Sequence, residues 1–188
     1  MREGYAMKSI VLAGGCFWGV QKFFDQFAGI HTVVGYANGM SEKPTYQEVC
    51  AGSGHTEAVE IFYEKPIRLV QILAAYFVII DPTSLNRQGN DIGINYRTGI
   101  YSNSGQDLKI ARMMIADLEK RIHARVVVET GPLNHFYDAE EYHQKYLDKN
   151  PGGYCHLPLS ILRGHSLPSI EQVLDKYPSL SGLPSDEL

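Results

Sequence analysis

Residues 9–19 read Ser-Ile-Val-Leu-Ala-Gly-Gly-Cys-Phe-Trp-Gly and join an apolar run of strand character to an amphipathic segment. In that segment, large apolar side chains recur at helical spacing, namely Phe17, Val20, Phe24 and Phe27. The pattern predicts a strand, a tight turn at Gly14 and Gly15, and a helix that ends near Gly29. Cys16 would then begin the helix, where the positive end of the helix dipole and unpaired N–H groups favour a thiolate.

The composition is that of an ordinary globular protein. With 188 residues the chain can bury about 70% of the surface it would expose when unfolded, so we expect a single domain over residues 1–188. The formal net charge is -4 and no Lys/Arg block exceeds two residues, which argues against nucleic acid and anionic membranes as partners. The longest apolar run, residues 72–80, is far shorter than the ~20 residues of a membrane span.

The three cysteines, Cys16, Cys50 and Cys155, are too few and too scattered for a disulfide framework or a metal site. The first residues lack the pattern of a signal peptide, and an odd number of cysteines suits a reducing compartment, so we expect a cytoplasmic protein. The glycine signatures of nucleotide-binding loops are absent, which argues against a nucleotide cofactor. We expect a monomer, and we expect a structural role for Cys50.

The rest of the chain alternates strands and helices, which predicts an α+β fold with a mixed sheet covered by helices. Further strands are expected over residues 31–36, 57–63, 97–102 and 125–130. Helices are expected over residues 64–80, 104–123, 138–149 and 170–177. The first of these would have Pro66 near its start, and the third would stack Tyr142 on Tyr146. Long irregular stretches remain at residues 37–56, at 81–96 and after 154, and loops of this length are usually functional.

Several chemically versatile residues fall in these irregular stretches or where they meet strands, namely Tyr46, Glu57, Asp91, Tyr96 and Cys155. None of them is decisive alone. A single glutamate is usually solvated, and most of the 12 tyrosines must pack in the core. Phe17 and Trp18, taken by themselves, are also more typical of a core than of a substrate site.

Five motifs carry more information together than these residues do apart. They are Gly-Cys-Phe-Trp-Gly at 15–19, Pro-Thr-Tyr-x-x-Val-Cys at 44–50, Gly-His-Thr-Glu-Ala-Val at 54–59, Gln-Gly-Asn-Asp-x-Gly at 88–93 and Gly-Tyr-Cys at 153–155. This set resembles the A-type peptide methionine sulfoxide reductases over about residues 8–158. The resemblance implies a two-layer α/β sandwich with a ferredoxin-like core. Apart from the short helix expected over residues 170–177, the polar composition of residues 159–188, rich in Ser, Pro and Gly, predicts a C-terminal extension of coil.

The resemblance also implies an activity, the thiol-dependent reduction of the S epimer of methionine sulfoxide, in proteins and free. Cys16 would be the nucleophile, Glu57 the acid and Cys155 the resolving thiol. The groups that bind the sulfoxide oxygen would be Tyr46, Asp91 and Tyr96. Thioredoxin would be the reductant, so the expected reaction uses an external dithiol and no bound cofactor.

The reaction can be compared with these residue types. A sulfoxide has no leaving group until its oxygen is protonated, so a thiol needs an acid beside it, and burial near aromatic rings would raise the pKa of Glu57 accordingly. Phe17 and Trp18 offer an apolar surface for the S-methyl group. Attack would leave Cys16 as a sulfenic acid, which Cys155, on a glycine-rich arm, would convert to a disulfide. No cysteine follows Cys155, so this disulfide would be the direct substrate of the reductant.

Three other functions stay open at this point. A thiol peroxidase would share the sulfenic acid and the resolving cysteine, although no arginine or threonine flanks Cys16 in the sequence. A thiol hydrolase would need a histidine base, for which the candidates are His55, His135, His143 and His156. A non-enzymatic module that binds peptides through aromatic side chains would keep Cys16 merely buried.

Overall fold

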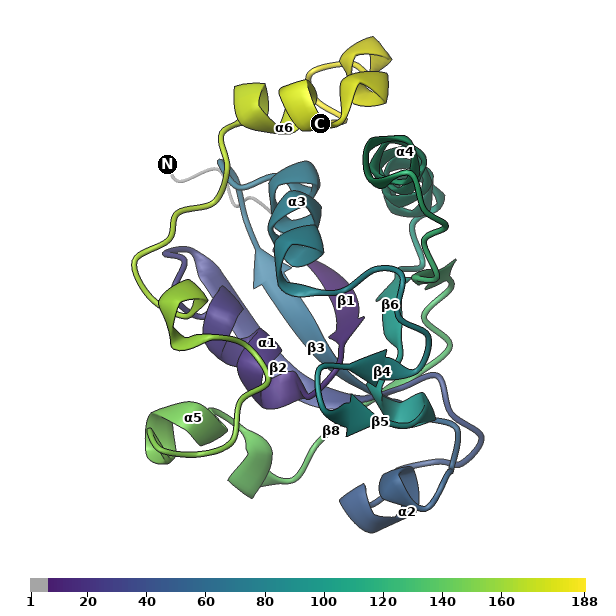
Figure 1. The fold of residues 1–188 in the computed structure, drawn as a ribbon, viewed down its shortest axis with the longest axis vertical. Helices are drawn as coiled ribbons and strands as arrows, with labels where there is room; N and C mark the ends of the chain where they lie inside the picture. Colours follow the sequence, from purple (N-terminus) through teal and green to yellow (C-terminus); the bar gives the residue numbers. More distant parts are fainter. Residues whose placement is uncertain (1–6) are drawn as a thin grey trace.

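The computed structural model describes residues 7–188, and a six-stranded sheet lies at its centre (Figure 1). The strand order is β7-β6-β1-β3-β2-β8. The elements that build the middle of the molecule are β1 (Lys8–Gly14), α1 (Phe17–Phe24), β2 (Ile30–Ala37), β3 (Thr56–Tyr63), α3 (Leu69–Ile79) and β6 (Thr98–Tyr101). Their strands follow the order β6-β1-β3-β2 and are antiparallel throughout, which is the ferredoxin-like arrangement of two strand–helix–strand units.

Two short strands extend this core at its edges. β7 (Glu129–Gly131) pairs parallel with β6, and β8 (Phe136–Asp138) pairs antiparallel with β2, so the sheet is mixed. Helices α1, α3 and α4 (Gly105–Ile122) cover one face of the sheet (Figure 1). Leu133 and Phe136, which follow β7, pack against the other face. The expected α+β fold is confirmed.

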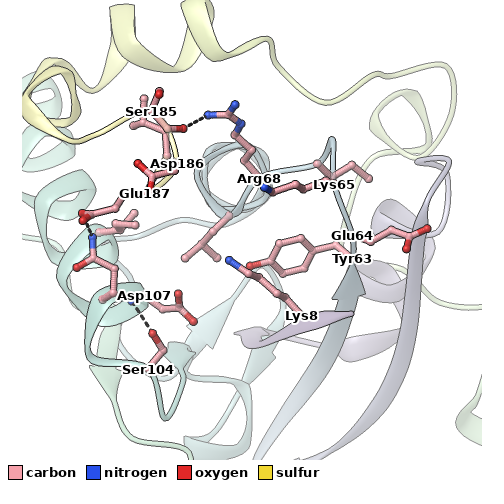
Figure 2. A pocket seen from close by; sticks show the side chains of 15 residues that line it. Lys8, Tyr63, Glu64, Lys65, Arg68, Ser104, Asp107, Ser185, Asp186 and Glu187 are labelled. Atoms are coloured by element: carbon pink, nitrogen blue, oxygen red, sulfur yellow. Dashed lines mark hydrogen bonds between the residues drawn. The ribbon is translucent and has the colours of Figure 1, made fainter. Parts of the chain in front are cut away.

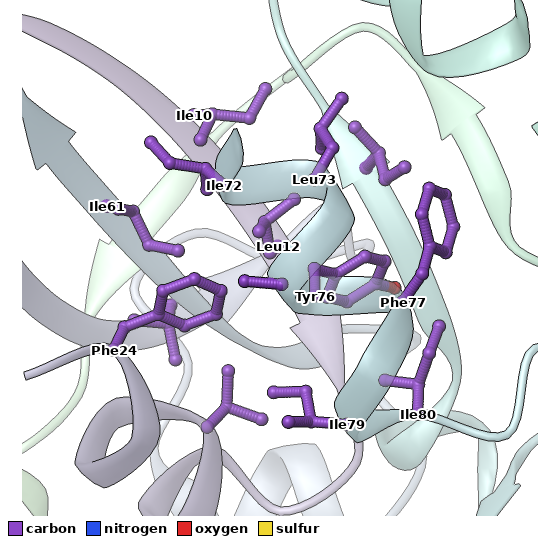
Figure 3. Close-up of a cluster of buried hydrophobic side chains, with 14 of the residues drawn as sticks. Ile10, Leu12, Phe24, Ile61, Ile72, Leu73, Tyr76, Phe77, Ile79 and Ile80 are labelled. Atoms are coloured by element: carbon purple, nitrogen blue, oxygen red, sulfur yellow. The ribbon is translucent and has the colours of Figure 1, made fainter. Parts of the chain in front are cut away.

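The side chains of β1 alternate between two buried layers. Ile10 and Leu12 face the helices (Figure 3), whereas Val11 and Ala13 belong to the smaller cluster on the opposite face. The hydroxyl of Tyr76, on α3, donates to the carbonyl oxygen of Ala13 at 2.7 Å. Because β1 is buried on both faces and is tied to α3, the corner at its C-terminal end is held in one place.

The C-terminal segment packs onto the helical layer. After the short 3-10 helix η3 (Leu159–Ile161), the chain forms α6 (Ile170–Lys176) and the 3-10 helix η4 (Pro178–Gly182), which contact α3 and α4 (Figure 1). Val173, Tyr177 and Leu180 are buried in the same hydrophobic cluster as the sheet and α3. The helix expected over residues 170–177 is confirmed. The expectation of a C-terminal coil is corrected, because these three apolar side chains anchor the segment.

Two other stretches differ from the expectations. Residues 37–56 are not a simple loop, because they contain α2 (Tyr46–Cys50), whose N-terminus is closed by a capping box between Thr45 and Glu48. The helix expected over residues 138–149 does not form. Instead, β8 is followed by the 3-10 helix η2 (Glu141–His143) and by α5 (Tyr146–Lys149). Lys145 separates the two with a φ of 53°, which no helix accommodates.

Smaller corrections concern the ends of elements. α3 begins at Leu69, so Pro66 lies before the helix and not in its first turn. Residues 125–128 form no strand, because the N–H of Val126 donates to the Glu119 carboxylate and the N–H of Val127 to the carbonyl of Pro82. The stretch 81–96 contains a hairpin of β4 (Arg87–Gln88) and β5 (Asp91–Ile92), followed by the 3-10 helix η1 (Ile94–Tyr96). None of the helices within residues 7–188 has the length and apolarity needed to cross a membrane.

Candidate active site

Cys16 lies at the corner between β1 and α1 and occupies the N-cap position of α1. The preceding residue, Gly15, has a φ of 83°, and a Cβ there would lie 2.6 Å from the Cβ of Gln88. Only glycine fits this turn, because a side chain would be strained and would collide with β4. The corner buries the Cys16 side chain, which is only 6% exposed.

Glu57 lies directly beside this corner, on the second residue of β3. The backbone N–H of Phe17 donates to its Oε2 at 3.0 Å, and the side chain is 1% exposed. Burial raises the pKa of Glu57 to about 8, the nearby charge of Asp91 raises it further, and the hydrogen bond from Phe17 opposes both. The carboxyl group is therefore mostly protonated at neutral pH, as an acid catalyst requires.

The pKa of the Cys16 thiol is also raised, which corrects the expectation of a resting thiolate. Burial is the main cause, and a charged Glu57 and Asp91 add to it. The N–H of Trp18 hydrogen-bonds the Cys16 sulfur and lowers the pKa, which is the expected effect of the helix N-terminus. That effect is smaller than the cost of burying a thiolate, so the resting thiol keeps its proton.

Two tyrosines from different elements meet near Glu57. Tyr46 begins α2 and Tyr96 ends η1, and their hydroxyl groups hydrogen-bond each other. Burial raises both pKa values, and the charge of Glu57 acts in the same direction. Both phenols therefore remain protonated and can donate hydrogen bonds to a bound oxygen.

Asp91 completes the polar side of the site from the first residue of β5. Its Oδ2 is buried and has no hydrogen-bond partner among residues 7–188. The hydroxyl of Tyr154 hydrogen-bonds Asp91, and burial together with this contact raises the pKa of Tyr154 to about 12. The hairpin of β4 and β5 thus brings a carboxylate from an irregular stretch to the corner of Cys16.

An aromatic group forms the apolar side. Trp18 is half-buried, and its ring stacks on Tyr146 with 3.7 Å between centroids, while its Nε1 donates to Nδ1 of His143 at 3.0 Å. Phe17 is 1% exposed and packs against Tyr36 and His143, so it belongs mainly to the core. Of the two aromatic residues expected to contact substrate, Trp18 is the more exposed.

Sequence reasoning missed Glu140 as part of this group and considered His143 only as a base for a hydrolase. The Glu140 carboxylate accepts hydrogen bonds from the Tyr36 hydroxyl at 2.6 Å and from the Tyr46 N–H at 2.9 Å. These bonds lower the pKa of Glu140 despite partial burial. Glu140 and His143 therefore fix the positions of Tyr46 and Trp18. The signal in the sequence is Glu-Glu-Tyr-His at 140–143, which falls within the helix expected over residues 138–149.

Cys155 reaches the site from the arm that follows α5. A Cβ on Gly19 would lie 2.9 Å from the Cys155 sulfur, so this sulfur packs directly on α1, and its charge affects the pKa of Cys16. All three cysteines are unpaired. Cys50 is exposed and hydrogen-bonds the Tyr46 hydroxyl. A structural role of Cys50 would therefore act through this hydrogen bond and not through packing in the core.

Two further observations concern metal ligands and a cavity outside this site. Within residues 7–188, no group of three or more His, Cys, Asp or Glu side chains is arranged to hold a metal ion. A cavity of about 410 Å³ near the C-terminus is lined by Lys8, Arg68, Asp107 and Glu187, and by none of the expected site residues (Figure 2). Its lining carries both basic and acidic side chains, and Arg68 points toward Ser185 and hydrogen-bonds its carbonyl (Figure 2).

The sequence is similar to those of known proteins over most of its length. Residues 8–171 match the model of the family described as peptide methionine sulfoxide reductase. The peptide methionine sulfoxide reductase MsrA of Clostridium acetobutylicum is 51% identical over 162 residues, which cover 85% of this chain and 100% of that protein. The MsrA of Clostridium botulinum strain Okra is 53% identical over 156 residues, covering 81% of this chain and 99% of that protein.

Solved structures of similar fold point to the same family. Reduced Mxr1 from Saccharomyces cerevisiae superposes with a TM-score of 0.76 at 36% identity, covering 83% of this chain and 95% of that one. Methionine sulfoxide reductase A of Corynebacterium diphtheriae gives 0.73 at 35% identity, covering 82% and 80%. Mxr1 in complex with Trx2 gives 0.53 at 27% identity, covering 77% and 90%.

Proposed function

The chain belongs to the peptide methionine sulfoxide reductase family and reduces methionine sulfoxide, and we propose that Cys16 and Glu57 carry out the chemical step on the S epimer. The observation that carries this proposal is the hydrogen bond from the Phe17 N–H to Oε2 of Glu57. It fixes a mostly protonated carboxylic acid beside the only buried cysteine of the described residues. Sulfoxide reduction by a thiol needs this pair, a nucleophile at sulfur and an acid at oxygen.

In the first step, the Cys16 sulfur bonds to the sulfoxide sulfur while Glu57 gives its proton to the sulfoxide oxygen. The oxygen then passes to Cys16 and methionine departs as a thioether. Cys16 is thereby oxidised to a sulfenic acid, and the substrate is reduced by the same two electrons. Solvent takes the proton that Cys16 loses on ionisation and returns one to Glu57 after the step, so the atoms and charges balance.

The polar groups around Glu57 suit the developing oxyanion. Tyr46 and Tyr96 are protonated donors that approach from α2 and η1. Once the oxygen carries a proton it becomes a donor, and the buried, unpartnered Oδ2 of Asp91 is an available acceptor. Trp18, held by His143 and Tyr146, offers an apolar face to the methyl group.

The second step regenerates the enzyme. The sulfur of Cys155 attacks the sulfenic acid of Cys16, and a disulfide and water are formed. Thioredoxin then reduces this disulfide, as the solved complex of the homologous Mxr1 with Trx2 supports. We also propose that the protein works as a cytoplasmic monomer without a prosthetic group, since each described step needs only side chains of one chain and an external dithiol.

Single-turnover reduction of a capped methionine sulfoxide tests the function. Without reductant, the S epimer should release about one methionine per enzyme with loss of two thiols, and the R epimer should release none. Cys50→Ser serves as a matched control, because it removes the exposed cysteine and should leave both values unchanged. A Cys16→Ser variant that still releases methionine would contradict the assignment of the nucleophile.

A further inference from the structure

His156 follows Cys155 directly, and its ring packs at the corner of Cys16. A Cβ on Gly15 would lie 3.4 Å from Nε2 of His156, and a Cβ on Gly19 would lie 3.4 Å from its Cε1. The same Cβ on Gly19 would lie 2.9 Å from the sulfur of Cys155. The imidazole therefore lies close both to the turn that carries Cys16 and to the sulfur that must attack it.

The fold engages the two ring nitrogens of His156 only weakly. Both Nδ1 and Nε2 are buried, and neither makes a hydrogen bond of normal length and angle among residues 7–188, although the Gly14 carbonyl is close enough to interact with the ring. Buried polar groups are normally satisfied, so a weakly engaged imidazole beside two reactive cysteines calls for an explanation. The Gly14 carbonyl and Asp91 favour the imidazolium, but burial outweighs them and lowers the pKa of His156. The ring is therefore neutral at neutral pH and can accept a proton.

We propose that His156 is the base of the disulfide-forming step, in which its imidazole accepts the thiol proton of Cys155. This inference rests on the proposed function, because it requires the sulfenic acid of Cys16. As the S–S bond forms, the S–O bond of the sulfenic acid breaks, and the imidazolium returns the proton to the departing hydroxide, which leaves as water. The Cys16 sulfur is reduced and the Cys155 sulfur is oxidised, so no further reactant is needed.

The step needs a base because burial raises the pKa of Cys155 above its ordinary value. The other titratable groups that face this space are less suited. Glu57, with a pKa of about 8, is already mostly protonated at neutral pH, and Tyr154, with a pKa of about 12, is also protonated. Asp91 accepts from the Tyr154 hydroxyl, its free Oδ2 is already assigned to the oxygen that Cys16 carries, and Cys16 itself is the electrophile. His156 is the remaining neutral acceptor.

Rapid mixing of His156→Gln with one equivalent of substrate separates the two steps. Release of methionine should be unchanged, whereas disulfide formation should slow by about 10²–10⁴-fold, the usual contribution of a general base. The sulfenic acid of Cys16 should then accumulate and be trapped by dimedone. His165→Gln is the matched control, since this exposed histidine of the same segment bonds the Ser160 carbonyl with its ring and the Gln26 side chain with its backbone N–H. It should leave both rates unchanged.

The pH profile distinguishes a base from a residue that only packs. In the wild type, disulfide formation should be nearly independent of pH between about 7 and 9, because the imidazole is neutral throughout. In His156→Gln the rate should rise about tenfold per pH unit, following the thiolate of Cys155. Added imidazole should restore the rate of His156→Ala at pH 7.

Two results would overturn the proposal. One is a normal rate of disulfide formation in His156→Gln. The other is a slowed rate that keeps the wild-type pH profile and does not respond to imidazole. A wild-type enzyme that releases no methionine contradicts the proposed function instead, and the disulfide step can then be started by oxidising Cys16 with hydrogen peroxide.

Discussion

Cys16 and Glu57 share one buried space, and burial raises the pKa of both. A neutral carboxylic acid suits the reaction, but a neutral thiol is a weak nucleophile. The reactive form, with Cys16 ionised and Glu57 protonated, is therefore a minor form of the resting site. The rate of sulfoxide reduction should therefore depend on pH through the ionisation of both Cys16 and Glu57.

We expect kcat/KM for sulfoxide reduction to rise about tenfold per pH unit up to about pH 8, because the thiolate fraction grows while Glu57 stays protonated. Above pH 8 the rate should level off, since the loss of the Glu57 proton cancels the gain in thiolate. A stopped-flow profile from pH 6 to 9.5 measures this. A profile that already levels off near pH 6 would mean that the thiol of the free enzyme is ionised, contrary to the effect of its burial.

Glu57→Gln should slow methionine release by about 10²–10⁴-fold, the range for the loss of a general acid. The amide oxygen can still accept the N–H of Phe17, so the fold around Cys16 should be kept. The variant should also lose the plateau above pH 8. A single-turnover rate within a factor of two of the wild type would remove Glu57 as the acid.

Sequence reasoning located these residues but not their protonation. The motifs identify Cys16 and Glu57, and the helix N-terminus correctly predicts that the Trp18 N–H favours the thiolate. The larger effect, burial, depends on tertiary packing at this corner, where Gln88 of β4 lies against Gly15 and the arm around Cys155 lies against Gly19, both far away in the sequence. The sequence around Cys16 does not indicate which distant segments pack against it. Whether the pKa of the Cys16 thiol is raised or lowered could therefore not be predicted.

At the scale of elements, the packing of the Cys155 sulfur against Gly19 of α1 positions this sulfur. Gly19→Ala would place a Cβ 2.9 Å from the Cys155 sulfur and force the arm outward. We expect methionine release to be kept and disulfide formation to slow at least tenfold, although alanine by itself stabilises a helix by about 1 kcal/mol. Timed counting of free thiols measures the step.

Gly105→Ala is the matched control, because Gly105 begins α4 and a Cβ there would meet no atom within 4 Å. It should leave both steps unchanged. An equally unchanged rate of disulfide formation in Gly19→Ala would mean that Cys155 does not approach Cys16 over this face of α1.

The elements that were predicted correctly are those with a long, regular pattern. Ser104 caps α4 and accepts the N–H of Asp107 as expected. By contrast, α2 has only five residues and no periodicity, although Thr45 and Glu48 form the capping-box pattern that could have revealed it. The helix expected after Asp138 fails because tertiary contacts with β2 engage its residues: the Ala139 N–H donates to the Val34 carbonyl, and the Gln144 side chain bonds both the N–H and the carbonyl of Val34.

For the whole molecule, the alternation of strands and helices sufficed to predict a helix-covered mixed sheet. The order of the strands and the two-layer core came from the family resemblance, and the docking of the C-terminal segment was not predicted. Tyr177 explains this failure, because its ring packs on Phe77 and beneath Arg121, two residues of distant helices. A short helix followed by Ser, Pro and Gly gives no sign of such partners.

Tyr177→Ala should lower the free energy of unfolding by about 3–5 kcal/mol, the range for removing a buried aromatic side chain. Urea denaturation measures the change. Leu159→Ala is the control, because Leu159 is 77% exposed and its loss should change stability by less than about 0.5 kcal/mol. Equal stabilities of the two variants would show that the C-terminal segment does not stabilise the helical layer.

The most direct test combines Cys155→Ser with dimedone trapping and mass spectrometry after mixing with the S epimer. One methionine should appear per enzyme, with a dimedone adduct at Cys16 formed at the same rate, and adding Glu57→Gln should slow both equally. Methionine released without an adduct at Cys16, or at a rate that Glu57→Gln leaves unchanged, would contradict the account.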